Sequence, residues 1–191
     1  MIDRIEEALA GLMSDSAQGV REAASGAMDR TRAKRSQEKF RERLRTGSQE
    51  EKIRMVFAAG EIGGAEGIGI LLDALSDGTE EVRGAAVRAL SAFPTPAVLK
   101  ALWEMLPKEK GVVLGNIVEA LGVSGRKELG PHVEKYLGHP DAEVRAKAVI
   151  ASSRLTEGAG WEKILAMRGD PEEMVRAAVA EALGNWTSAR P

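Results

Sequence analysis

A short pattern that returns about every thirty residues is the feature that most constrains the fold of this chain. Three segments, 76–90, 138–152 and 169–183, align without gaps. Each has a turn, an acidic pair, an apolar residue followed by Arg, and then an Ala- and Val-rich stretch. The apolar-Arg steps are Val82-Arg83, Val144-Arg145 and Val175-Arg176.

Three weaker copies extend the pattern toward the N-terminus and fill its middle. Two of them keep the step, as Val20-Arg21 and Ile53-Arg54, and the third has Val112 as its apolar residue with Val113 in the place of Arg. The apolar residues at 20, 53, 82, 112, 144 and 175 are then 33, 29, 30, 32 and 31 positions apart. Periods of this length predict an array of stacked supersecondary units.

Each unit is predicted to contain two helices. In the third unit, an apolar segment over 67–76 stops at Asp77-Gly78, and Thr79 is placed to cap a second helix. The second helix places apolar residues on one side, at the i, i+3, i+4, i+7 and i+8 positions. These residues are Val82, Ala85, Ala86, Ala89 and Leu90.

One such hairpin cannot bury its apolar face alone, whereas stacked hairpins cover one another. We therefore predict an all-α fold, an α-solenoid (superhelix) of about six antiparallel helical hairpins. The array should span 1–186 as one domain, with the first helix as an N-terminal cap and a frayed tail over 187–191. The approximate units are 1–30, 31–63, 64–93, 94–123, 124–156 and 157–186.

These residues resemble the HEAT-repeat family, in particular its short repeats of the bilin-lyase-like type. The resemblance implies a ladder between neighbouring repeats, formed by an Asp in the turn and an Arg six residues later. The matching pairs are Asp15 and Arg21, Asp77 and Arg83, and Asp170 and Arg176. The Asp place holds Ser48 in the second unit and His139 in the fifth, and the fourth unit has Pro107 and Val113 in the two places. The ladder is therefore predicted to be broken in the middle.

Catalytic and cofactor sites are not predicted. The chain has no Cys, which excludes disulfides and thiolate metal sites, and its two histidines are His132 and His139. One HEAT-type enzyme class, deoxyhypusine hydroxylase, binds two irons through repeated His-Glu pairs, but Val133 and Pro140 follow the histidines here. The Gly-rich stretch 60–69 lacks the Lys-Ser/Thr ending of a phosphate loop. We expect no enzyme activity, no metal and no cofactor.

The chain is expected to be cytoplasmic, without insertion into a membrane. Charges at Asp3, Arg4, Glu6 and Glu7 argue against a secretory signal at the N-terminus. No stretch has the ~18 apolar residues that a membrane helix needs.

Segment 30–45 is strongly basic, with eight cationic and two acidic side chains, while the whole chain carries a net charge of −2. It is either a solvated outer helix with Phe40 and Leu44 inward, or a surface for an acidic protein, a nucleic acid or another polyanion. The candidate binding residues are Arg30, Arg32, Lys34, Arg35, Lys39, Arg41, Arg43 and Arg45.

The leading hypothesis is a protein–protein adaptor that uses the concave and end surfaces of the array, with Arg88 as the candidate on the concave side. It rests on the fold and is therefore associational. Nucleic-acid binding through 30–45 is the alternative, and a chaperone that attaches a bilin chromophore is a second alternative suggested by the resemblance. Trp103, Trp161 and Trp186 are expected to pack in the core or at the ends rather than to stack on a ligand.

Overall fold

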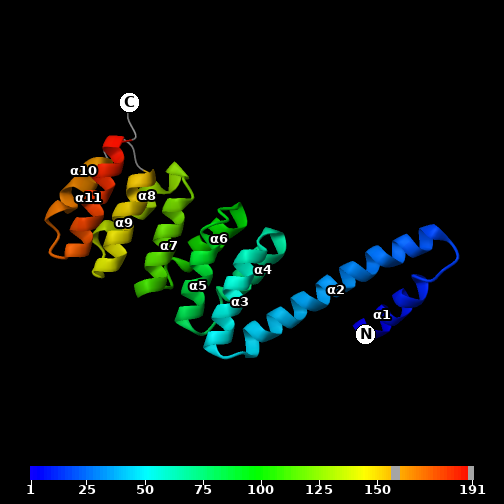
Figure 1. The fold of residues 1–191 in the computed structure, drawn as a ribbon. Helices are drawn as coiled ribbons and strands as arrows, with labels where there is room; N and C mark the ends of the chain where they lie inside the picture. Colours follow the sequence, from blue (N-terminus) through cyan, green and yellow to red (C-terminus); the bar gives the residue numbers. More distant parts are fainter. Residues whose placement is uncertain (156–159, 189–191) are drawn as a thin grey trace. The chain divides into compact units, whose positions relative to one another are not determined.

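The computed structural model describes residues 1–155 and 160–188, without the side chains of Ala33, Lys34, Gln37 and 186–188. All regular elements of this part of the chain are helices, so the predicted all-α solenoid is confirmed (Figure 1). No helix among the described residues is both long and apolar enough to cross a bilayer. The chain divides into two compact units, Met1–Met55 and Val56–Pro191.

The first unit contains α1 (Ile2–Leu12), α2 (Gln18–Thr46) and the start of α3 (Gln49–Ile62). Helix α1 packs along α2 but has no fully buried residue. Its apolar residues Ile5 and Leu12 are 42% and 46% exposed. The apolar side of this expected N-terminal cap is therefore largely open.

Helix α2 runs without interruption through positions 30 and 31, where the sequence pattern placed a boundary between two hairpins. No Gly or Pro lies between Gly26 and Gly47, and most residues there are strong helix formers. Met28 and Leu44 are both buried. At 100° per residue they lie about 160° apart around the helix. The two halves of one long helix thus bury opposite sides and replace the turn that separate hairpins would need.

The second unit is a double layer of helices. Its second-position helices α5 (Glu80–Leu90), α7 (Gly111–Val123), α9 (Ala142–Leu155) and α11 (Glu173–Ser188) contact one another in that order (Figure 1). The first-position helices α4 (Gly64–Ala74), α6 (Pro96–Met105), α8 (Gly130–Val133) and α10 (Gly160–Ala166) form the other layer. Short 3-10 helices flank two of them: η1 (Lys127–Leu129) and η2 (Glu134–Gly138) around α8, and η3 (Met167–Gly169) after α10. Of the expected tail, Thr187 and Ser188 belong to α11, and 189–191 lie outside the described residues.

The core corrects the register of the fourth unit. Val113 is fully buried, whereas Val112, which the sequence pattern took as the anchor, is 45% exposed. With Val113 as the anchor, the buried valines Val82, Val113, Val144 and Val175 are each 31 positions apart. The tandem Val-Val pair left this choice open in the sequence, and the close packing of α5, α7 and α9 selects the second valine.

Candidate interaction surfaces

Arginines near the start of four helices, α2, α5, α9 and α11, hold the turn that precedes each helix. In each, NH1 donates hydrogen bonds of 2.8–3.3 Å to the carbonyl oxygens six and five positions earlier. Within one repeat, the arginine therefore binds the backbone carbonyl, not the carboxylate, of the Asp six positions earlier; in the fifth repeat the carbonyl belongs to His139. The four residues are Arg21, Arg83, Arg145 and Arg176.

The side chain six positions before each arginine has a separate task, which is to fix the start of the helix. Asp15, Asp77 and Asp170 each accept a hydrogen bond through Oδ1 from the backbone N–H two residues later, at 2.8–3.0 Å. His139 accepts the corresponding bond from Asp141 through Nδ1, at 3.1 Å. The histidine that replaces Asp in the fifth repeat thus keeps the turn by using a ring nitrogen as acceptor.

Two ion pairs connect neighbouring repeats. Arg83 donates from Nε and NH2 to the two carboxylate oxygens of Glu109, at 2.8 and 3.0 Å. Arg145 donates from the same atoms to Asp170, at 2.9 Å each. The arginine of one repeat is therefore bound by an acid of the following repeat. In the register set by Val113, the Asp place of the fourth repeat holds Lys108, and the carboxylate comes from its neighbour Glu109, which the sequence pattern did not single out.

These pairs shift the ionisation of their members. The hydrogen bonds from Arg145 lower the pKa of the Asp170 carboxyl, and burial opposes this shift without overcoming it. The carboxylates of Glu109 and Asp170 raise the pKa of Arg83 and Arg145, respectively. Arg83, Arg145 and Asp170 are charged near neutral pH, and the members of each pair use their hydrogen-bonding groups on one another. These four side chains therefore serve to hold the fold together.

The fourth repeat has no ladder arginine, because the register set by Val113 places the buried Leu114 at that position. Instead of an ion pair, a polar contact centred on Asn116 connects α7 with α5 and α9. Asn116 is 3% exposed and donates from Nδ2 to the Gly84 carbonyl at 3.3 Å, while its Oδ1 accepts a hydrogen bond from Lys147. Lys147 in turn lies 3.6 Å from a Glu119 oxygen. These groups satisfy one another and leave no convergent catalytic set.

Arg88, the expected concave-surface residue, is exposed on α5 near Gly84. Its backbone carbonyl accepts a hydrogen bond from the Ser91 hydroxyl. Nothing else in the described structure gathers around its guanidinium, so Arg88 stays a candidate on charge and exposure alone.

The basic segment lies on α2, and its cations fall into two stripes. Arg32, Arg35, Lys39 and Arg43 follow each other at three- and four-residue spacing and so share one side of the helix, while Arg30, Arg41 and Arg45 share another. The side chain of Lys34 lies outside the described residues. Among the others, Arg35 binds Asp3 at 2.8 Å and Glu6 at 2.7 Å, and Arg45 binds Glu42 at 2.8 Å.

Arg35 therefore ties α2 to α1, and its part in binding a polyanion is reduced accordingly. Arg30, Arg32, Lys39 and Arg43 are exposed. None of these four forms an ion pair with another described residue.

Where the described aromatic and histidine side chains contact one another, they do so in pairs. Trp103 is 40% exposed and meets His132 edge to face, with ring centroids 4.6 Å apart. Trp161 is partly buried at the start of α10, and the side chain of Trp186 lies outside the described residues. Across 1–155 and 160–188, no three His, Cys, Asp or Glu side chains are grouped as metal ligands would be.

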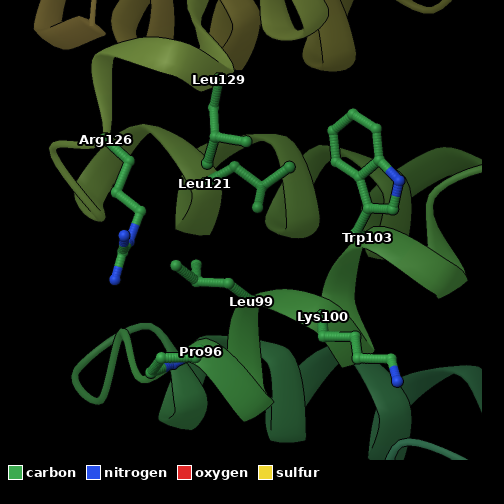
Figure 2. A pocket seen from close by; sticks show the side chains of 7 residues that line it. All are labelled: Pro96, Leu99, Lys100, Trp103, Leu121, Arg126 and Leu129. Carbon is green, nitrogen blue, oxygen red and sulfur yellow. The ribbon is translucent and has the colours of Figure 1, made fainter.

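An apolar groove lies between α6 and the segment that joins α7 to α8, and sequence analysis missed it. Its volume is about 280 Å³, and Leu121, which is 1% exposed, forms part of its lining. Leu99 and Trp103, one helical turn apart on α6, face Leu129 across the hollow (Figure 2). Pro96 completes the apolar wall.

Two cations flank this groove, with Lys100 and Arg126 on opposite sides in Figure 2. Lys100 lies 3.9 Å from Glu104, and its side chain is 78% exposed. Arg126 lies 3.6 Å from Glu128. Exposed pairs of this kind contribute about 0–1 kcal/mol, so both cations remain free to bind a partner's acid. The i, i+4 spacing of Leu99 and Trp103 was visible in the sequence, but the opposite wall comes from a segment more than twenty residues away.

Residues 38–122 match the family of HEAT repeats. No curated protein matches the chain significantly.

Solved structures show the same fold at low sequence identity. An engineered protein is 18% identical, with 97% of each chain covered and a TM-score of 0.53. The complex of CpcE and CpcF of phycocyanin lyase from Nostoc sp. PCC7120 is 20% identical, with 94% of this chain and 76% of that chain covered and a TM-score of 0.56. At these identities the likeness is one of fold.

Proposed function

This chain carries HEAT repeats, and from that premise we propose that it is a non-catalytic scaffold that binds another protein through the groove beside α6. The observation that carries the proposal is an apolar hollow whose two sides each hold an exposed cation, Lys100 and Arg126. At about 280 Å³ it is smaller than most small-molecule sites, which run from about 300 to 1,000 Å³. It has room for one or two apolar side chains of a peptide segment.

The positive charges of Lys100 and Arg126 favour an acidic peptide segment of the partner. A peptide with a large apolar residue between acidic residues would bury that residue against Leu99, Trp103 and Leu121 and place its acids near the two cations. Aromatic and arginine side chains are enriched among the residues that dominate protein interfaces. The partner is accordingly an acidic protein, and the first-position layer, rather than the layer that carries Arg88, forms the docking surface.

A random peptide library displayed on phage tests this proposal on the full chain. Enriched peptides should contain a large apolar residue with Asp or Glu close by. Their affinity should fall about tenfold or more for the Lys100→Glu, Arg126→Glu double variant, because both cations become repulsive. The matched control is Arg88→Glu, which should leave affinity unchanged. Absence of enrichment, or equal binding to the double variant, would refute the groove as the site.

Polyanion binding through α2 is the second candidate. It is favoured by four exposed cations, Arg30, Arg32, Lys39 and Arg43, none of which forms an ion pair with a described acid. Binding of a nucleic acid by these residues would weaken steeply with salt. Fluorescence anisotropy with a labelled oligonucleotide at two salt concentrations measures this. The Arg32→Gln, Lys39→Gln, Arg43→Gln variant should then lose most of the binding, and no binding of the wild type at low salt would eliminate the candidate.

The bilin hypothesis is supported by the resemblance of the repeats and by the fold-level likeness to a phycocyanin lyase complex. No described residue of this chain carries it further. A cytoplasmic location also stays a prediction.

A further inference from the structure

The interior of the array provides a template for how one repeat binds the next. Arg145 uses NH1 for the carbonyl oxygens of His139 and Pro140, and it uses Nε and NH2 for the carboxylate of Asp170. The first pair of bonds stays within a repeat, and the second pair crosses to the following one. We call such an arginine–carboxylate pair between neighbouring repeats a rung. A complete rung needs an arginine from one repeat and a turn carboxylate from the next, and a half-rung is either residue without the other.

Arg176 is half of such a rung. Its NH1 donates to the carbonyl oxygens of Asp170 and Pro171 at 2.8 Å each, which is the pose of Arg145. The side chain is exposed, and no acid among the described residues forms an ion pair with it. Its Nε and NH2 edge is therefore oriented for a carboxylate that the rest of the described array does not supply.

Asp15 is the complementary half. Its Oδ1 accepts the Ala17 N–H at 2.8 Å, as Asp170 Oδ1 accepts the Glu172 N–H at 3.0 Å. In Asp170 the carboxylate is also held by Arg145. No described arginine holds Asp15 in this way, and the residue is only partly buried.

On the helices that carry the two half-rungs, α11 and α2, residues are exposed whose equivalents in the inner repeats are buried. Five positions after the anchor, Val87, Val118 and Val149 are fully buried, whereas Ala180 of α11 is exposed. Gly122 of α7 lies against Ala151, whereas the equivalent Gly184 has no atom near the place of a Cβ.

On α2, Val20 occupies the anchor position that is completely buried in the four valines of the second unit, yet it is only partly buried. Ala23, three positions later, is exposed, while its equivalent Ala85 is 3% exposed.

We propose that this protein associates head to tail with a second copy of itself, through a rung between Arg176 of one molecule and Asp15 of the next. Both halves are on the same chain, they have opposite charge, and each is already in the pose that the Arg145–Asp170 rung requires. The small side chains Ala177, Ala180 and Gly184 allow α2 of the second copy to approach α11 closely. Since the two surfaces differ, the contact is heterologous and continues beyond a dimer unless a ring closes.

Sedimentation velocity over a wide concentration range at low salt tests the proposal with the full chain. The mean mass of the wild type should rise with concentration past that of a dimer and fall when sodium chloride is added. Asp15→Arg and Arg176→Asp should each remain monomeric, because each brings like charges together. The double variant Asp15→Arg, Arg176→Asp restores an opposite pair and should associate again.

Two further variants separate association from folding. Ala180→Arg leaves both half-rungs intact but fills the open face of α11, and it should be monomeric with an unchanged circular dichroism spectrum. Arg154→Asp changes an exposed arginine on α9 outside the rung and should associate like the wild type. A wild type that is monomeric at every concentration, or reversal variants that associate as it does, would overturn the proposal.

Discussion

Arg145 and Asp170 are joined by two parallel hydrogen bonds of 2.9 Å, and their side chains are only 12% and 6% exposed. The two residues belong to successive repeats. Arginine in this bidentate geometry fixes both distance and orientation. The pair therefore sets how the sixth hairpin sits on the fifth, which turn-internal bonds alone could not do.

Low pH should weaken the ion pair between Arg145 and Asp170. The pKa of Asp170 is lowered in the folded protein, from an ordinary value of 3.8, so its contribution to stability is complete above that value. The contribution is lost as pH falls below about 4 and through the folded pKa. We expect the Tm advantage of the wild type over Asp170→Asn to narrow in that acidic window and to be constant from pH 5 to 7. An advantage independent of pH would contradict the charge-based account.

The Arg83–Glu109 pair offers a double-mutant cycle. Arg83→Met should lower the free energy of unfolding by about 1–3 kcal/mol, because it strands a largely buried carboxylate and frees two turn carbonyls. Glu109→Gln should cost less, since the amide still accepts one bond. Urea denaturation of both single variants and the double variant should give a coupling of about 0.5–3 kcal/mol. Strict additivity would show that the two residues do not interact.

Gly122 and Gly184 occupy equivalent positions with opposite surroundings. A Cβ on Gly122 would lie 2.5 Å from Ala151 of the next helix, whereas Gly184 has nothing within 4 Å. Gly122→Ala should destabilise the array by about 1–3 kcal/mol through overpacking. Gly184→Ala should leave it unchanged or stabilise α11 by about 0.5–1 kcal/mol. Thermal melts of the two variants measure this, and a similar Tm for both would refute the close approach of α7 and α9.

The register of the fourth repeat can be checked with two neighbouring valines. Val113→Ala removes two buried methyl groups and should cost about 2 kcal/mol, including the cavity. Val112→Ala removes exposed methyl groups and should change stability by about 0.5 kcal/mol or less. Chemical denaturation distinguishes the two, and the reverse order would restore the register with Val112 as the anchor.

Much of the fold could be predicted from the sequence, because the period of apolar residues reports which side of each helix is buried. The candidate site could not be predicted. The spacing of Leu99 and Trp103 indicates an apolar side of α6. The groove, however, also requires Leu121 of α7 and Leu129 of η1, whose approach to α6 the local sequence does not show. Likewise, the spacing of Asp and Arg indicated a ladder but not that Arg83 reaches Glu109, which lies 26 residues away.

The sequence by itself determined an all-helical repeat array, since anchors spaced 29–33 residues apart and turn acids six residues before an arginine can be read directly from the chain. Only the tertiary structure decided that Val113 and not Val112 is the buried anchor, and that a single helix spans 18–46. It also decided that Arg176 and Asp15 are half-rungs without a partner among the described residues. The physical reason is the same in each case. Burial and ion pairing depend on the neighbouring repeat, which a local pattern does not contain.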